Sequence, residues 1–145
     1  MISIVEPEVG FAVGIIRQSA QLARRVQAEM LGAGLTKGDL SPVTVADYVS
    51  QAVVAEGLSR VFPEDALVGE ESSGPLRTAE GAPVLEAVAR FAATALGPVT
   101  EEAVCAWIDR GTATPGGRFW TLGPGGGTKG FLRGGQYAGA LALIE

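Results

Sequence analysis

The residues of this chain that could do chemistry are carboxylates and hydroxyls, because its 145 residues include no histidine. Asp39 and the adjacent Glu70 and Glu71 are the main acidic candidates, and Thr128 is a hydroxyl in a glycine-rich segment. Without histidine, Ser-His-Asp and Cys-His catalysis and His-ligated zinc sites are excluded. Chemistry would therefore rest on carboxylates, hydroxyls, lysine or a hard metal ion held by oxygen ligands.

Each candidate also has an ordinary structural interpretation. Glu70 and Glu71 alone would form a solvated acidic loop, and Asp39 and Thr128 would be turn residues. Asp47 stands three positions after a threonine, which is the spacing of a helix-capping box, so a capping role and a role in a site both stay open for it.

The glycine-rich segment invites two familiar phosphate-binding interpretations. A P-loop requires Gly-Lys-Ser/Thr, whereas the order here is Thr128-Lys129-Gly130, which does not fit. Gly125, Gly127 and Gly130 satisfy G-x-G-x-x-G, but the residues that follow supply no helix for a dinucleotide pyrophosphate. In a chain with 21 glycines, that pattern is weak evidence.

The periodicity of apolar residues predicts helices and strands that would position these groups. Helices are expected from about Val9 to Leu31, from a cap at Thr44 to Pro63, and from Val84 to Ala95, with a short fourth helix capped by Thr100. Strands are expected at 66–69, 119–122 and 137–144, and loops at 72–83 and in the glycine-rich segment. This order predicts an α/β (α+β) layered domain over residues 1–145.

Composition limits the partners and the compartment. Apolar residues make up 47% of the chain, which suits one globular domain, and no stretch resembles a signal peptide or a membrane span. A net charge of −5 without a basic cluster argues against nucleic acid as a partner. The single cysteine, Cys105, is expected to be a buried apolar residue in a reducing compartment, so we expect a cytoplasmic protein with no membrane contact. The oligomeric state stays open.

Four segments, in order, resemble the 3′(2′),5′-bisphosphate nucleotidase branch of the inositol monophosphatase-like superfamily. They are Lys37–Asp47, Phe62–Gly74, Arg118–Leu122 and Thr128–Gly134. The resemblance implies a layered sandwich with N-terminal helices packed on a mostly antiparallel sheet, of which this chain would be the N-terminal, metal-site half. Because the apolar strand 137–144 has no polar tail after it, we expect a partner strand or subunit to be missing.

The resemblance also implies a Mg²⁺-dependent phosphatase acting on a small-molecule nucleotide bisphosphate in sulfur assimilation. The expected substrates are adenosine 3′,5′-bisphosphate and 3′-phosphoadenylyl sulfate. Glu70 would ligate one metal ion, and the backbone carbonyl of Gly125 would be a further ligand. Asp39 and Thr128 would orient and deprotonate the attacking water, and Thr128 with Lys129 would contact the substrate.

Two positions depart from this pattern. The family's metal loop is Asp-Pro-Ile-Asp-Gly-Thr, whereas Gly123 and Gly126 stand here at the positions of the aspartate ligands. Since glycine offers no charged oxygen, we expect impaired Mg²⁺ binding. Two alternatives to an active phosphatase therefore remain, namely an inactive relative that acts as a binding module and an incomplete sequence with no autonomous function.

Overall fold

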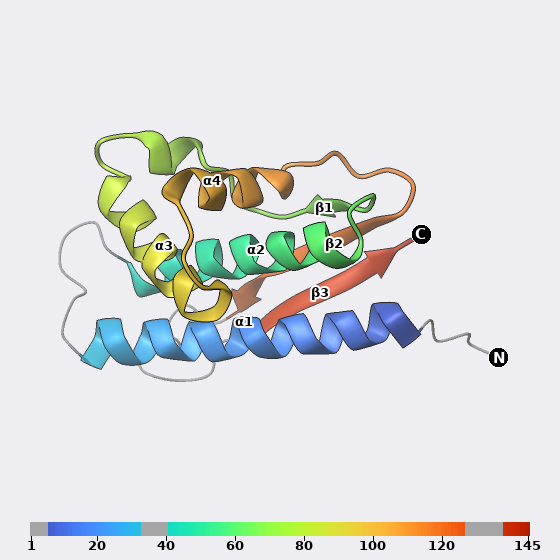
Figure 1. The fold of residues 1–145 in the computed structure, drawn as a ribbon, viewed down its shortest axis with the longest axis horizontal. Helices are drawn as coiled ribbons and strands as arrows, with labels where there is room; N and C mark the ends of the chain where they lie inside the picture. The colour runs from blue at the N-terminus through green and yellow to red at the C-terminus, as the bar shows by residue number, and fades with distance from the viewer. Residues whose placement is uncertain (1–5, 33–40, 127–137) are drawn as a thin grey trace.

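The structure, a computed structural model, describes residues 6–32, 41–126 and 138–145 (Figure 1). In chain order, its elements are α1 (Glu6–Gly32), α2 (Pro42–Val61), β1 (Ala66–Val68), the 3₁₀ helix η1 (Gly74–Arg77), α3 (Ala82–Leu96), α4 (Glu101–Arg110), β2 (Phe119–Gly126) and β3 (Ala138–Ile144).

The three strands form one mixed sheet in the order β1-β2-β3. β1 pairs with β2 in parallel, with Leu67 opposite Trp120, and β2 pairs with β3 antiparallel. The antiparallel pair is the longer one, and helices pack against the sheet. The layered α/β class predicted from the sequence is therefore confirmed.

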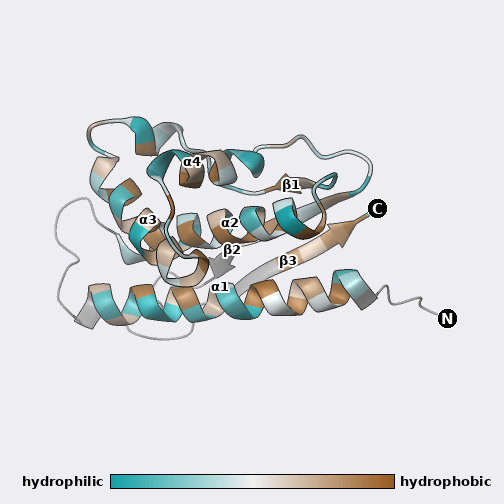
Figure 2. Cartoon of the chain, in the orientation of Figure 1, coloured by the Kyte–Doolittle hydropathy of each residue, from teal (hydrophilic) through white to brown (hydrophobic). Residues whose placement is uncertain are grey.

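Helix α2 is the centre of this arrangement (Figure 1). It contacts α1, α3, α4 and β2, while α1 also contacts β3. Because neighbours surround α2, most of its residues are buried, including Val45, Val49, Val53 and Leu58. Helix α1 is instead amphipathic, with hydrophobic and hydrophilic residues alternating along it (Figure 2). Its buried face includes Ile15, Leu22, Val26 and Met30.

Aromatic side chains join three elements at the start of β2. Phe11 of α1 lies edge-on to Phe62, which follows α2, with ring centroids 5.5 Å apart, and edge-on to Trp120 of β2 at 5.4 Å. Such edge-to-face pairs stabilise beyond the area that they bury. The trio fixes where β2 begins relative to α1 and α2.

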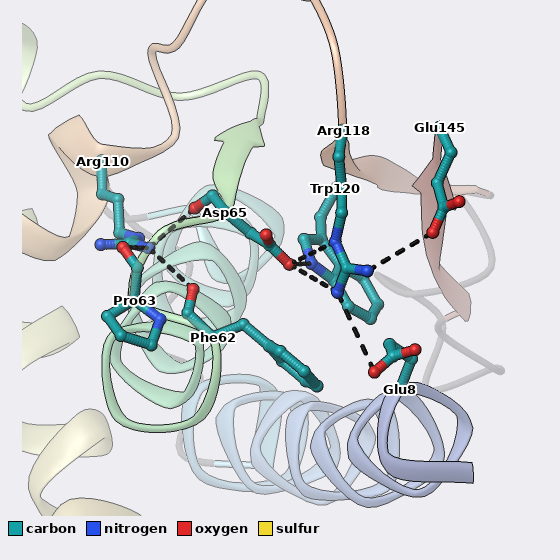
Figure 3. A network of polar contacts seen from close by, with 8 residues as sticks. All are labelled: Glu8, Phe62, Pro63, Asp65, Arg110, Arg118, Trp120 and Glu145. Atoms are coloured by element: carbon teal, nitrogen blue, oxygen red, sulfur yellow. Dashed lines mark hydrogen bonds and ion pairs between the residues drawn. The ribbon is translucent and has the colours of Figure 1, made fainter. Parts of the chain in front are cut away.

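Charged groups reinforce the same corner (Figure 3). The Arg118 guanidinium lies 2.9 Å from Asp65, 3.4 Å from Glu145 and 3.9 Å from Glu8. Nearby, Arg110 Nη2 donates hydrogen bonds to the carbonyl oxygens of three residues between α2 and β1, namely Phe62, Pro63 and Asp65. These contacts hold the α2–β1 connection against β2, β3 and the end of α4.

Several predicted element boundaries are confirmed. α1, α3 and β3 occupy the expected ranges, and Thr100 caps α4 by accepting a hydrogen bond from the Ala103 amide at 3.0 Å. Cys105 is buried, as predicted, and burial raises the pKa of its thiol. None of the described helices is both long enough and apolar enough to cross a bilayer.

Three local predictions are wrong. Ser41 caps α2, because its side chain accepts from the Thr44 amide, so the Thr44–Asp47 capping box does not form. The predicted loop at 72–83 contains η1. β2 continues through Gly126 because antiparallel pairing, with Gly123 opposite Ala140 and a register shift before Gly126, extends it into glycines expected to form a loop.

Candidate functional site

A small acidic pocket lies where α1, α2, the residues after β1, and β2 meet. Its volume is about 40 Å³. The lining residues are Ile16, Ser19 and Ala20 of α1, Asp47, Ser50 and Gln51 of α2, Glu70 and Glu71 after β1, and Leu122 and Gly123 of β2. We call this set the acidic pocket.

The parallel pairing of β1 and β2 explains why Glu70 and Gly123 meet there. Val68 lies opposite Thr121, and each candidate stands two positions further along its own chain segment. Parallel strands bring their carboxyl ends to one edge of a sheet, which is where such folds commonly bind ligands. Glu70 and Gly123, 53 positions apart in the sequence, therefore line the same pocket.

Carboxylates interact within the pocket. Burial, then Asp47, then Glu70 raise the pKa of the half-buried Glu71 carboxyl. Burial and, secondarily, Glu71 raise the pKa of Tyr48. Burial is the larger cause of both shifts, and the neighbouring carboxylates add to it because negative charges close together favour the neutral forms. A cation in the pocket would relieve this repulsion.

Ser19 adds a neutral polar group to the acidic pocket. Its hydroxyl oxygen is buried and has no hydrogen-bond partner among the residues that the structure describes. Buried hydroxyls are rarely left unbonded, so Ser19 is a group that a small polar ligand in the pocket could satisfy.

The residues predicted from the sequence divide into three groups. Glu70 and Gly123 both line the pocket, while Gly125 and Gly126 lie further along β2, where Gly126 pairs with Ala138. Asp39, Thr128 and Lys129 lie outside the described residues.

Sequence reasoning named Glu71 beside Glu70 but assigned it no role, missed Ser19 and Gln51 as site residues, and left Asp47 undecided. Ser50 and Gln51 lie three and four positions after Asp47 on α2, so both are on the same face of the helix as Asp47. This polar face on a largely buried helix is a signal that the sequence contains. The position of Asp47 in the pocket, with Ser41 as the cap, argues for a role in the site.

The carboxylates of the acidic pocket are of the right chemical type for a hard cation, because carboxylate oxygens are the ligands that Mg²⁺ and Ca²⁺ prefer. It does not assemble a complete metal centre among the described residues, since no three acidic or cysteine side chains there come close enough together to hold an ion. Gly123 contributes to this shortage, because it lines the pocket without a carboxylate.

Comparison with known protein families matches residues 4–145 to the inositol monophosphatase family. The chain belongs to this family. Family membership confirms the resemblance seen in the four segments.

Three curated relatives of this chain are named 3′(2′),5′-bisphosphate nucleotidases. A Schizosaccharomyces pombe protein is 40% identical over 97% of this chain, and an Arabidopsis thaliana protein, nucleotidase 1, is 41% identical over 97%. A Candida albicans relative, nucleotidase 2, is 42% identical over 77% of the chain. The matches cover 44%, 43% and 34% of those proteins, so the chain spans less than half the length of these relatives.

Proposed function

We propose that this chain corresponds to the metal-site half of a 3′(2′),5′-bisphosphate nucleotidase, a phosphatase that hydrolyses adenosine 3′,5′-bisphosphate to the 5′-monophosphate. The observation that carries the proposal is the meeting of Asp47, Glu70 and Glu71 with Gly123 in one pocket. The names of the relatives supply the substrate class. 3′-Phosphoadenylyl sulfate as a second substrate, a role in sulfur assimilation and a cytoplasmic location belong to the same proposal.

With aspartates at positions 123 and 126, the pocket carboxylates would hold a divalent cation, for which Mg²⁺ is our proposal; without them, we expect its binding to be impaired. When bound, such a cation neutralises charge on a phosphoryl group and lowers the pKa of water. Glu70 is the proposed ligand from the segment after β1, and Gly125 would contribute its backbone carbonyl. Asp47 and Glu71 surround that ligand with negative charge. Asp39 and Thr128 remain predicted groups for orienting water, and Thr128 and Lys129 for contacting the substrate.

A second candidate function is a non-catalytic binding module. It is favoured by Gly123, which lines the pocket at a position where the sequence resemblance calls for an aspartate ligand. With Gly126 also lacking a carboxylate, the cation site would lose two charged ligands. This alternative predicts nucleotide binding that does not require a divalent cation.

Phosphate release from adenosine 3′,5′-bisphosphate tests the proposal. The purified chain is compared with a Gly123→Asp/Gly126→Asp variant, each with Mg²⁺ and with a chelator. We expect little release from the chain itself and Mg²⁺-dependent release from the variant, because the added carboxylates complete the ligand set. Adding Glu70→Ala to that variant should abolish the gain, while adding Glu80→Ala, a change at an exposed glutamate away from the pocket, should preserve it.

Other outcomes separate the alternatives. Activity in the unmodified chain that is lost on Glu70→Ala would support the phosphatase and contradict the expected impairment. No release from either protein would indicate that the metal-site half is not sufficient for hydrolysis, even with both aspartates restored. Calorimetric binding of the nucleotide in chelator would then favour the binding module, and absence of binding would favour a chain with no autonomous function.

A further inference from the structure

The Gln51 side chain forms a hydrogen-bonded clamp on the backbone of Glu71. Gln51 is only 1% exposed. Its Nε2 donates to the Glu71 carbonyl at 2.7 Å, and its Oε1 accepts from the Glu71 amide at 3.0 Å. A second hydrogen bond from Nε2 reaches the Ile108 carbonyl at 2.7 Å. Both Nε2 hydrogens are thus used, and the amide pairs with Glu71 as a neighbouring strand would.

Two glycines make room for this clamp. A Cβ atom on Gly69 or on Gly111 would overlap the Gln51 side-chain amide. The same two residues are joined directly, because the Gly69 amide donates to the Gly111 carbonyl at 2.6 Å. The Gln51 amide is therefore packed closely between the segment that leads into Glu70 and the end of α4.

The clamp acts on a segment that lacks regular secondary structure. β1 ends at Val68 and η1 begins only at Gly74. The Glu71 N–H bond to Gln51 fixes the peptide between the two pocket glutamates, and the Glu71 C=O bond fixes the next peptide, between Glu71 and Ser72. Because Asp47 lies one helical turn before Gln51, the same helix supplies a pocket carboxylate and the clamp.

The chemistry of this buried amide favours a positioning role over simple packing. Burying an amide costs free energy unless its hydrogen bonds are replaced, and an apolar side chain of similar shape would fill the space without that cost. The Gln51 amide instead forms two hydrogen bonds with the backbone of Glu71, within the acidic pair. We infer that Gln51 is a positioning residue that sets the Glu70-Glu71 backbone so that both carboxylates line the acidic pocket. Its relevance to catalysis rests on the proposed function, but its geometry does not.

The test replaces Gln51 with an apolar side chain of similar size, Gln51→Met. Amide hydrogen exchange and the amide proton chemical shift of Glu71 are measured by NMR, and carboxyl labelling of Glu70 and Glu71 with a carbodiimide and an amine is measured by mass spectrometry. The matched control is Val54→Ala, which removes buried volume from the same helix but keeps the Gln51 side chain that bonds to Glu71. Gln51→Asn is the milder second variant, because it keeps the amide but shortens its reach.

We expect Gln51→Met to accelerate amide hydrogen exchange at Glu71. This acceleration should exceed that of the slowest-exchanging core amides by about tenfold or more. The Glu71 amide proton should move upfield, and labelling of the half-buried Glu71 should rise toward that of exposed Glu70. Gln51→Asn should do the same to a smaller degree. Val54→Ala should accelerate the core amides and Glu71 together.

A purely structural role for Gln51 would overturn the inference. In that case, all three variants would accelerate amide exchange at Glu71 by the same factor as in the core amides. The Glu71 amide proton shift and the carboxyl labelling of Glu71 would stay unchanged. If Gln51→Met does not fold, the same comparison between Gln51→Asn and Val54→Ala decides the matter. None of these measurements depends on phosphatase activity, so failure here and failure of the proposed function are separate results.

Discussion

Trp120 donates a hydrogen bond from its indole Nε1 to Asp65 Oδ2 at 2.9 Å, which links β2 to the connection between α2 and β1. The same carboxylate oxygen accepts from Arg118 Nε at 3.0 Å (Figure 3). Asp65 thus holds the first residues of β1 beside the first residues of β2. Because the two strands are parallel, this contact helps to fix the register that brings Glu70 and Gly123 together at the other end.

Asp65→Ala should lower the free energy of unfolding by about 1–3 kcal/mol, because it leaves the buried indole N–H of Trp120 without its acceptor. Urea unfolding monitored by circular dichroism measures this change. The neighbouring exposed residue provides the control, since Glu64→Ala should change stability by less than about 0.5 kcal/mol. Equal effects of the two substitutions would contradict the role given to Asp65.

Helix caps give a second prediction. Thr100→Ala should destabilise the protein by about 1 kcal/mol, because the Thr100 hydroxyl oxygen accepts the hydrogen bond of the Ala103 amide at the start of α4. Thr44→Ala should have little effect, since Ser41 and not Thr44 caps α2. Thermal unfolding of both variants checks the pair. A larger loss of stability from Thr44→Ala than from Thr100→Ala would instead support the capping box predicted from the sequence.

Local patterns predicted most of the helices. The apolar spacing in α1 and α3 and the threonine before α4 are properties of residues close in the sequence, and the structure agrees with them. The end of β2 depends instead on a distant partner. Its glycines favour a loop when considered alone, and only pairing with β3 extends the strand to Gly126. Interactions between distant segments therefore set the boundary that local propensity misplaced.

In the acidic pocket, too, residues with local sequence signals were predicted, and residues that depend on distant contacts were not. Glu70 was recognised because it follows a short buried strand and lies in a segment that resembles the family. Gln51 was missed because its three hydrogen bonds reach residues 20 and 57 positions away. Asp47 was undecided because its spacing from Thr44 suited a cap, and only the fold shows which face of α2 lines the pocket.

Asp109 provides a third prediction, at the segment that follows the acidic pair. Its carboxylate accepts from the Ser73 amide at 2.8 Å and from the Ser73 hydroxyl at 2.6 Å, which ties the start of η1 to α4. Asp109→Ala should cost about 1–3 kcal/mol, because Ser73 is buried and loses both acceptors. Glu102→Ala removes the exposed ion pair with Arg77 and one first-turn carboxylate of α4, and should cost much less stability than Asp109→Ala. Urea unfolding distinguishes them, and a comparable loss in both variants would argue against a specific role for the buried contact.

The last prediction concerns pH and Glu71. Burial, then Asp47, then Glu70 raise the pKa of this carboxyl above its ordinary value of 4.5, so the folded chain binds the Glu71 proton more tightly than the unfolded chain does. The contribution of Glu71 to the free energy of unfolding therefore falls as pH rises from 4.5 through the raised pKa. Glu71→Gln removes the ionisable group, and with it this pH-dependent loss of stability.

We expect the Glu71→Gln variant to be more stable than the parent chain at pH 7 and to lose that advantage near pH 4, where the parent carboxyl is protonated in both states. Thermal unfolding across this range measures the difference. Glu80→Gln, at an exposed position, should show no such dependence on pH. An equal difference at both pH values would mean that side-chain shape, and not charge, distinguishes Glu71→Gln from the parent. Lower stability of the variant at pH 7 would contradict the repulsion inferred among Asp47, Glu70 and Glu71.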